Sequence, residues 1–254
     1  MAFHGTVALI TGAGSGMGQL AARRLAEQGA KVAALDLNEE GLRQTQSGHD
    51  NVRNFAVDVT NAQAVDAAVK EIETDLGPID RVFNAAAIMP SARILDQDRE
   101  EIHRIMEINY GGIVNVTLAV LPGMIERGSG DMVNFASMAG WLPAPDLGAY
   151  HASKFAVVAF CEVLYWENRK KGVRFACVCP PVVNTPLLEQ ATSNPAWLAT
   201  APKIEPEVVL DAIEKSLEKG QLFVFPGFGT KFAWRLRRFF PGLIWWRFKN
   251  TDKL

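Results

Sequence analysis

The stretch from residue 6 to residue 36 constrains the fold more than any other part of this chain. Residues 6–10 form a short apolar run, the pattern of a parallel strand covered on both faces. The glycine-rich residues 12–18 follow, and after them comes a helical pattern. A second apolar run, residues 31–35, ends at Asp36. Strand, glycine turn, helix and strand in this order predict the first unit of a parallel α/β sheet.

The glycine turn also indicates a binding site. Without side chains there, backbone N–H groups can approach a pyrophosphate at the positive end of the following helix. Asp36 can accept hydrogen bonds from both ribose hydroxyls of adenosine and would repel a 2′-phosphate, while Ala13, Ser15 and Leu37 supply no compensating cation. The sequence therefore favours NAD over NADP. A tight strand-to-helix connection and an ordinary acid at the start of a loop are the less favoured interpretations.

Composition restricts the class of protein. A chain of 254 residues with 48% hydrophobic residues can bury a large core, and its net charge of −2 argues against a general nucleic-acid binder. Cys161, Cys177 and Cys179 form no C-x-x-C pair and are expected as core thiols in a reducing compartment, with no metal site. We find no secretory signal and no uninterrupted apolar run long enough for an ordinary membrane span, so we expect a cytoplasmic protein.

Three polar positions indicate chemistry. Tyr150 and Lys154 are four residues apart, one helical turn on the same face, and a nearby cation lowers a phenol's pKa from about 10 by favouring the phenolate. Tyr150 could then act as a general acid or base. Ser137 follows a predicted strand, residues 131–136, and its hydroxyl can reach the same cleft. Tyr-x-x-x-Lys also occurs by chance on surface helices, so the rest of the chain has to support this interpretation.

The helical pattern from Arg99 to Ile125 places Asn109 among apolar positions. A buried amide needs hydrogen-bond partners. Asn109 either satisfies a backbone carbonyl or belongs to the site, and the residues alone leave both open.

Six motifs follow one another in the chain: Thr11-Gly-x-x-x-Gly16-x-Gly18, Asn84-Ala85-Ala86, Asn109, Ser137, Tyr150-x-x-x-Lys154 and Pro180-x-x-Val183-x-Thr185. With these motifs in this order, the sequence resembles the classical short-chain dehydrogenase/reductase family. The resemblance runs from about residue 5 to residue 225. It implies an α/β fold with a doubly wound parallel sheet, the Rossmann fold, in a single domain. We assign residues 1–226 to this domain, with a substrate loop near residues 182–205, and residues 227–254 to a basic, aromatic C-terminal extension.

The resemblance also implies a role for each matching residue. Ser137 would hold the substrate oxygen, Tyr150 would be the acid/base, and Lys154 would lower the tyrosine pKa and bind the nicotinamide ribose. Asn109 would support a water leading to the lysine. The expected NAD-binding residues are Gly12, Ser15, Gly16, Met17, Gly18, Asp36, Asp58, Val59, Asn84, Tyr150, Lys154, Val183 and Thr185.

We expect an NAD-dependent dehydrogenase of a secondary alcohol, or a reductase of the matching ketone. A non-catalytic NAD-binding regulator or scaffold, and an epimerase or dehydratase on the same fold, are the alternatives. The residues that the motifs place at the cleft carry no charge, which predicts an apolar substrate: Met89, Trp141, Leu142, Leu147, Val182, Leu187 and Leu188. The same residues could instead pack a mobile lid onto the domain.

The C-terminal extension is basic and aromatic. From Lys219 to Thr251 the chain holds seven basic residues and no acid, so the remainder of the chain carries a net charge of −9. Aromatic and aliphatic residues recur at helical spacing up to a break at Pro241, and a tryptophan pair follows at residues 245–246. This pattern suits the headgroup layer of an anionic membrane. The alternative is that the extension wraps over the substrate cleft or over a neighbouring subunit. The resemblance implies a homodimer or homotetramer through the helices from Arg99 and from Ala149.

Overall fold

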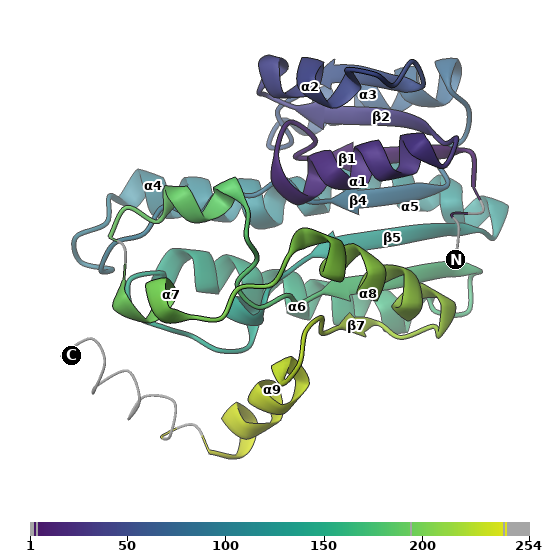
Figure 1. Cartoon of the computed structure of the whole chain (residues 1–254). Coiled ribbons are helices and arrows are strands. Elements are labelled where there is room, and N and C mark those ends of the chain that lie inside the picture. Colours follow the sequence, from purple (N-terminus) through teal and green to yellow (C-terminus); the bar gives the residue numbers. More distant parts are fainter. Residues whose placement is uncertain (1–2, 4, 194, 241, 243–254) are drawn as a thin grey trace.

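In the part of the chain that the structure describes, residue 3 and residues 5–193, 195–240 and 242, seven parallel strands form one sheet. Their spatial order in this computed structural model is β3-β2-β1-β4-β5-β6-β7 (Figure 1). The strands are β1 (Val7–Thr11), β2 (Lys31–Asp36), β3 (Val52–Ala56), β4 (Arg81–Asn84), β5 (Gly130–Phe135), β6 (Val173–Val178) and β7 (Phe223–Val224). The strand order reverses between β1 and β4, which confirms the predicted doubly wound sheet.

Helices cover both faces of this sheet, which is why β1 is buried along its whole length. On one face lie α1 (Gly16–Glu27) and α8 (Pro206–Glu218), and on the other lie α3 (Ala62–Asp75), α5 (Gly112–Arg127) and α6 (Gly148–Asn168) (Figure 1). The remaining helices are α2 (Glu39–Gln46), α4 (Arg99–Met106), α7 (Ala196–Thr200) and α9 (Thr230–Phe239). Short 3₁₀ turns are η2 (Met138–Gly140) and η3 (Pro186–Gln190).

The helix predicted from Arg99 to Ile125 is divided by a π-helical turn, η1 (Glu107–Gly111). By length and composition alone, the span Arg99–Arg127 is the one candidate for a membrane-crossing helix among the described residues. Its side chains Val116, Val120 and Met124 are buried against the sheet. The span therefore serves as a core helix of this domain.

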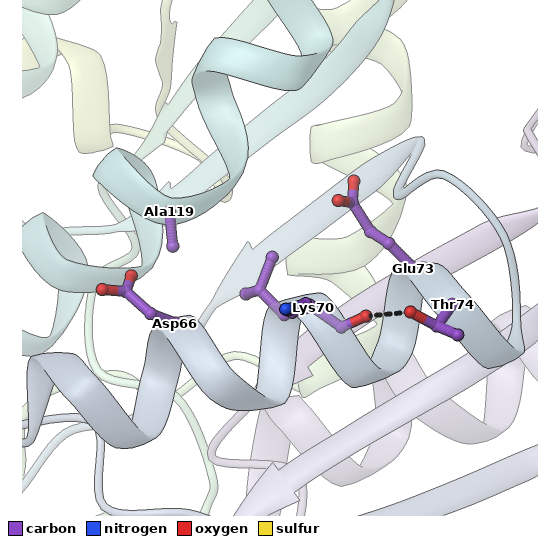
Figure 2. A pocket seen from close by; sticks show the side chains of 6 residues that line it. Asp66, Lys70, Glu73, Thr74 and Ala119 are labelled. Atoms are coloured by element: carbon purple, nitrogen blue, oxygen red, sulfur yellow. Dashed lines mark hydrogen bonds between the residues drawn. The ribbon is translucent and has the colours of Figure 1, made fainter.

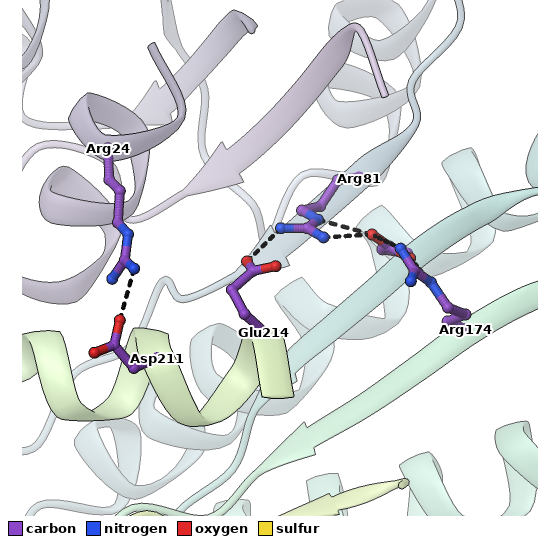
Figure 3. Close-up of polar contacts among 6 residues, drawn as sticks. Arg24, Arg81, Arg174, Asp211 and Glu214 are labelled. Carbon is purple, nitrogen blue, oxygen red and sulfur yellow. Dashed lines mark hydrogen bonds and ion pairs between the residues drawn. The ribbon is translucent and has the colours of Figure 1, made fainter. Parts of the chain in front are cut away.

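A buried ion-pair network joins the amino ends of β4, β5 and β6 to α8 (Figure 3). The Arg81 side chain, 1% exposed, donates to Asp131 from Nε at 2.8 Å and from Nη2 at 2.6 Å, and Nη1 donates to Glu214 at 2.5 Å. Arg174 donates to both oxygens of Asp131, at 2.6 and 2.9 Å. Arg81 begins β4, so this network lies at the opposite end of the strands from the glycine turn.

The predicted core thiols are confirmed: Cys161, Cys177 and Cys179 are buried and free. In the C-terminal extension the structure describes α9, which continues beyond β7 away from the sheet (Figure 1). The predicted break at Pro241 and the tryptophan pair at residues 245–246 lie outside the described residues.

Candidate active site

The glycine turn between β1 and α1 leaves no room for a side chain at Gly12 or Gly18. Gly12 has a left-handed backbone, with φ 67°, and a Cβ there would stand 2.8 Å from the backbone nitrogen of Ala86. A Cβ on Gly18 would stand 2.2 Å from the carbonyl oxygen of Gly12, so α1 can approach the turn this closely only with glycine. Ser15, which precedes α1, makes no side-chain capping hydrogen bond. The first N–H groups of α1 are therefore available to an anionic group.

A groove of about 620 Å³ follows the carboxyl ends of the central strands. It is lined by all the predicted residues of the glycine turn and by four further predicted cofactor residues: Gly12, Ser15, Gly16, Met17, Gly18, Asp36, Asp58, Val59 and Thr185. A dinucleotide fits this groove, because glycines bring the backbone to its surface and the amino end of a helix opens into it.

Asp36 is held in a fixed orientation at the end of β2. Its Oδ2 accepts the Gly14 N–H at 2.8 Å and its Oδ1 accepts the Asn38 N–H at 2.8 Å. Arg104 is the one cation among the described residues that line the groove, which also has the acids Asp36, Asp58 and Glu107. The carboxylate thus faces the groove with no arginine or lysine among its hydrogen-bond partners.

Ser137, Tyr150 and Lys154 meet between the end of β5 and the first turns of α6. The Tyr150 hydroxyl is hydrogen-bonded to Ser137, and Ser137 Oγ also accepts the Ala139 N–H at 3.0 Å. Lys154 is buried and donates from Nζ to the carbonyl oxygen of Phe135 at 2.8 Å. Its Nζ lies 5.7 Å from the centre of the Tyr150 ring. The structure thus brings together the three groups that the sequence predicted to act in one cleft.

Burial shifts the pKa values of both Tyr150 and Lys154. Burial raises the pKa of Tyr150 to about 12, and the hydrogen bond to Ser137 only partly opposes this shift. Burial likewise lowers the pKa of Lys154 to about 8, with the neighbouring thiols acting in the other direction. Burial thus outweighs the hydrogen bond in this arrangement, and the predicted lowering of the phenol pKa by Lys154 stays a prediction.

Asn109 lies in the π-helical turn η1 and is fully buried. Its Oδ1 accepts the Ile88 N–H at 2.8 Å, and its Nδ2 donates to the Ile88 carbonyl at 2.9 Å and to Ser153 Oγ at 3.1 Å. Both ends of the amide thus hold the segment after β4 against α6. This contact with a backbone carbonyl is one of the two roles that the sequence left open, and the predicted water contact stays a prediction.

His151, the neighbour of Tyr150, was missed by the sequence analysis. Its Nε2 accepts the Ala144 N–H at 3.0 Å, so the proton is on Nδ1, which donates to the Ala139 carbonyl at 2.8 Å. The ring thereby connects the turn after Ser137 to the catalytic helix. Burial lowers the pKa of His151, against a smaller opposite effect of the Ala139 hydrogen bond. A polar residue at a buried helix position was the one signal available in the sequence.

The predicted substrate loop lies closed over the segment that follows β4. Gln190 Oε1 accepts the Met89 N–H at 2.9 Å. The hydroxyls of Ser91 and Ser193 are 2.7 Å apart, and Thr192 Oγ1 donates to the Ser91 carbonyl at 3.0 Å. These contacts hold η3 and the residues that follow it over this segment, and we call η3 and α7 the lid.

Beneath this lid is an apolar cluster that includes Tyr150. It contains five of the seven residues predicted to line the cleft, together with residues that the sequence analysis missed: Met89, Leu147, Val182, Leu187 and Leu188, with Leu198, Trp197, Ala139 and Ala191. The apolar surroundings of the tyrosine hydroxyl therefore come largely from the lid.

Trp141 and Leu142 are the two predicted cleft residues that are not part of this cluster. Trp141 packs in a different cluster, where its Nε1 donates to Cys179 Sγ at 3.3 Å. Its ring lies 5.3 Å from those of Phe223 and Trp234. The prediction for Trp141 is corrected, because aromatic residues that follow β6 along the sheet edge offer this indole a partner surface.

Four predicted cofactor residues are not among those that line the groove: Tyr150 and Lys154, described above, and Asn84 and Val183. Asn84 is buried and its Nδ2 donates to Asn134 Oδ1 at 2.9 Å on the neighbouring strand, while the alanines that follow it line the groove. Val183 is buried in the hydrophobic core beside α8, whereas Thr185 reaches the groove. Asn84 is paired with Asn134 on β5, so its side chain is used within the sheet. Contact with a dinucleotide is left to Ala85, Ala86 and Ala87, which line the groove.

A second hollow of about 470 Å³ lies on the outer surface of α3 and α5 (Figure 2). It is lined by Asp66, Val69, Lys70, Glu73, Thr74 and Ala119. The Thr74 hydroxyl donates to the Lys70 carbonyl at 2.7 Å within the helix. None of these residues borders the groove or the Tyr150 cluster, so we assign this hollow no part in the chemistry.

A Rossmann sheet, a dinucleotide groove and a buried Ser-Tyr-Lys cluster together define an oxidoreductase that uses a nicotinamide cofactor. The chain belongs to the short-chain dehydrogenase family, whose model, described as short chain dehydrogenase, matches residues 6–196.

Curated relatives agree with this assignment. The chain is 36% identical over 196 residues to SadH of Mycobacterium tuberculosis, which is described as an oxidoreductase, with 75% of this chain and 71% of the relative covered. It is 31% identical over 244 residues to estradiol 17-beta-dehydrogenase 11 of Pongo abelii, with 93% of this chain and 80% of the relative covered.

Solved structures share the fold over nearly the whole chain. A short chain dehydrogenase/reductase from Burkholderia phymatum in complex with NAD has a TM-score of 0.85 at 25% identity, with 96% of each chain covered. A gluconate 5-dehydrogenase from Burkholderia cenocepacia in complex with NADP and tartrate has a TM-score of 0.78 at 28% identity, with 91% of this chain and 96% of that chain covered. Members with either dinucleotide therefore share this architecture.

Proposed function

We propose that this protein is an NAD(H)-dependent oxidoreductase that oxidises a lipophilic secondary alcohol or reduces the matching ketone. The observation that carries the proposal is that Tyr150, Ser137 and Lys154 come together where β5 ends, with Leu187 of the Tyr150 cluster also lining the dinucleotide groove. Two adjacent hydroxyls can bind one carbonyl or alcohol oxygen between them, which is what a positioned proton transfer requires.

In ketone reduction, Ser137 donates a hydrogen bond to the carbonyl oxygen and Tyr150 donates the proton that this oxygen gains. A nicotinamide bound in the groove supplies the hydride to the carbonyl carbon. In alcohol oxidation Tyr150 accepts the hydroxyl proton instead. We propose that Lys154, whose Nζ lies 5.7 Å from the centre of the Tyr150 ring, offsets part of the burial that disfavours the phenolate this direction needs.

The protonation of Tyr150 predicts how each direction depends on pH. A phenol with a pKa raised to about 12 is protonated at neutral pH and is ready to donate, so ketone reduction needs no prior ionisation. Alcohol oxidation requires the phenolate, and its rate is expected to rise as the solution becomes alkaline. Initial rates in both directions across the same pH range measure this difference.

The preference for NAD rests on Asp36. Its carboxylate is fixed by two backbone N–H groups at the end of β2, where the family fold binds the adenosine ribose. A 2′-phosphate brought there would meet this negative charge, and no cation among the described residues bonds to Asp36 to offset it.

The lipophilic substrate is inferred from the lid. The residues packed around Tyr150 are apolar, with Met89 and Leu147 from the body and Leu187 and Leu188 from η3. Estradiol, which the name of one relative specifies, is a secondary alcohol of this apolar kind. The gluconate 5-dehydrogenase neighbour is named for a polar substrate, so the lid residues rather than the shared fold support an apolar one.

Tyr150→Phe tests the proposal. The ring still packs but cannot transfer a proton, so turnover should fall by about two orders of magnitude or more while NADH binding persists. NADH absorbance is followed with a graded panel of lipophilic alcohols and ketones, and Tyr165→Phe, the same change in the same helix away from the cluster, is the matched control. Retained activity in Tyr150→Phe would reject the tyrosine as acid/base. A wild-type protein that binds NADH but turns over no member of the panel would favour a regulatory role.

We further propose that the protein forms a homodimer or homotetramer through α5 and α6. These helices expose large apolar side chains on the surface away from the sheet: Leu118 on α5, and Phe155, Val163 and Trp166 on α6. A second copy of the chain would remove this surface from water.

A further inference from the structure

Helix α9 is attached to the body along one side. Thr230, its first residue, donates from its hydroxyl to the Pro226 carbonyl at 2.7 Å. One turn later Trp234 packs against Trp141 at 5.3 Å and stacks on Phe225 at 5.5 Å between ring centres. This side of α9 is therefore occupied by the aromatic cluster at the end of the sheet.

The opposite side of α9 is covered by nothing in the described part of the chain. Phe232 is 69% exposed and Phe239 is 70% exposed. Arg235 lies between them on the helix and is also exposed. Residues 232, 235 and 239 are three and four positions apart and share one face, whereas Trp234 is two positions from Phe232 and points away from it. We call Lys231, Phe232, Arg235 and Phe239 the outer face of α9, since Lys231 is exposed as well and lies four positions before Arg235.

We propose that the outer face of α9 docks on an anionic lipid membrane. Contact with the boundary of the acyl chains would remove the exposed rings of Phe232 and Phe239 from water. The cations of Lys231 and Arg235 would lie at the depth of the acidic headgroups. This inference does not depend on the proposed reaction, since it concerns a surface outside the Tyr150 cluster.

The distribution of charge favours an anionic membrane over a second copy of α9 as the partner of this face. The segment from Lys219 to Thr251 has seven basic residues and no acid, and the rest of the chain has a net charge of −9. A second α9 docked on the first would bring like charges together. An anionic membrane attracts the basic segment while it repels the acidic body, which orients the molecule with α9 toward the lipid. None of the α9 side chains that the structure describes belongs to the apolar cluster beneath the lid, so a role as a cover for Tyr150 is not favoured.

The test measures binding of the full chain to vesicles of phosphatidylcholine with and without phosphatidylserine, by co-sedimentation. Wild type should bind the phosphatidylserine vesicles at low salt and be released as salt rises. Lys231→Glu with Arg235→Glu should weaken this binding by about tenfold or more, since each basic residue near such a surface contributes to attraction. Phe232→Ser with Phe239→Ser should weaken it on both vesicle types.

Matched controls use exposed residues away from α9. Lys70→Glu with Lys170→Glu changes the net charge by the same amount, and Val208→Ser removes an exposed apolar side chain from α8. Both should bind vesicles nearly as wild type does. Because the substituted side chains are exposed, all variants should keep NADH binding, which verifies folding.

Two results would overturn the proposal. The first is a full-length protein that ignores phosphatidylserine vesicles at low salt, or charge-reversed α9 variants that bind them as well as the controls do. The second is loss of the oligomer in sedimentation velocity for the α9 variants with unchanged lipid binding, which would assign the outer face of α9 to a subunit interface.

Discussion

Asp131→Asn is predicted to destabilise the fold strongly although it lies far from the reacting groups. Asp131 accepts four hydrogen bonds, two from Arg81 and two from Arg174, and the Arg81 side chain is 1% exposed (Figure 3). The neutral amide cannot balance two guanidinium groups, so Arg81 would be left in the interior with Glu214 alone. Removing one member of a buried pair costs about 3–5 kcal/mol.

We expect the lower end of that range, about 3 kcal/mol, for two structural reasons. Glu214 continues to neutralise Arg81, and Arg174 is 40% exposed, so water can solvate it. For a chain of this size the change corresponds to a fall of about 6–12 °C in Tm.

Asp211→Asn is the matched control. Asp211 pairs with Arg24 at 2.6 Å beside the buried network, but the two side chains are 52% and 36% exposed. Such a pair contributes about 0–1 kcal/mol. The same chemical change should therefore have a small effect here.

Urea unfolding followed by circular dichroism, at one fixed protein concentration, measures both variants. Equal destabilisation by Asp131→Asn and Asp211→Asn would refute the reasoning that burial determines the cost. A folded Asp131→Asn enzyme should keep its kcat/KM, since the network lies at the amino ends of the strands and the chemistry at the carboxyl ends.

Four further predictions concern the site and the assembly. Asp36→Ala with Leu37→Arg should shift the preference toward NADP(H), compared as kcat/KM for the two cofactors, and equal use of both by wild type would contradict the role of Asp36. Lys154→Ala should lower turnover and NADH affinity together, and a change in only one of them would separate the two roles assigned to the ammonium. Burial holds the pKa of His151 below 6.5, so the unfolded chain takes up its proton first and stability is lost as the pH falls below that value. His151→Gln should flatten this part of the urea-unfolding profile, and an unchanged profile would assign it to other groups. Trp166→Glu should dissociate the oligomer in sedimentation velocity, whereas a wild-type monomer over a wide concentration range would exclude the α5–α6 interface.

Local sequence patterns determined the elements and the groove. Gly18 is required by contacts below 3 Å with Gly12 in its own strand-turn-helix unit, and Gly12 by its left-handed backbone, so both can be recognised locally, although the close approach of Ala85 and Ala86 to Gly12 appears only in the fold. Asp36 ends the strand that pairs with β1, and the spacing along the chain was sufficient to place it at the same edge. The Tyr150 and Lys154 pair is likewise set by one turn of one helix.

Contacts between distant segments decided the rest. Trp141 follows the catalytic turn in sequence, yet it packs on Phe223 and Trp234, some eighty to ninety residues away, because the sheet edge brings these rings together. The pKa of Tyr150 is raised because the residue is buried, in a cluster to which the body and the lid both contribute, and the spacing to Lys154 cannot reveal that burial. The sequence pattern of one helix or strand shows which of its faces is apolar. Which segment packs on that face, and which polar groups this packing removes from water, is decided only by the folded chain.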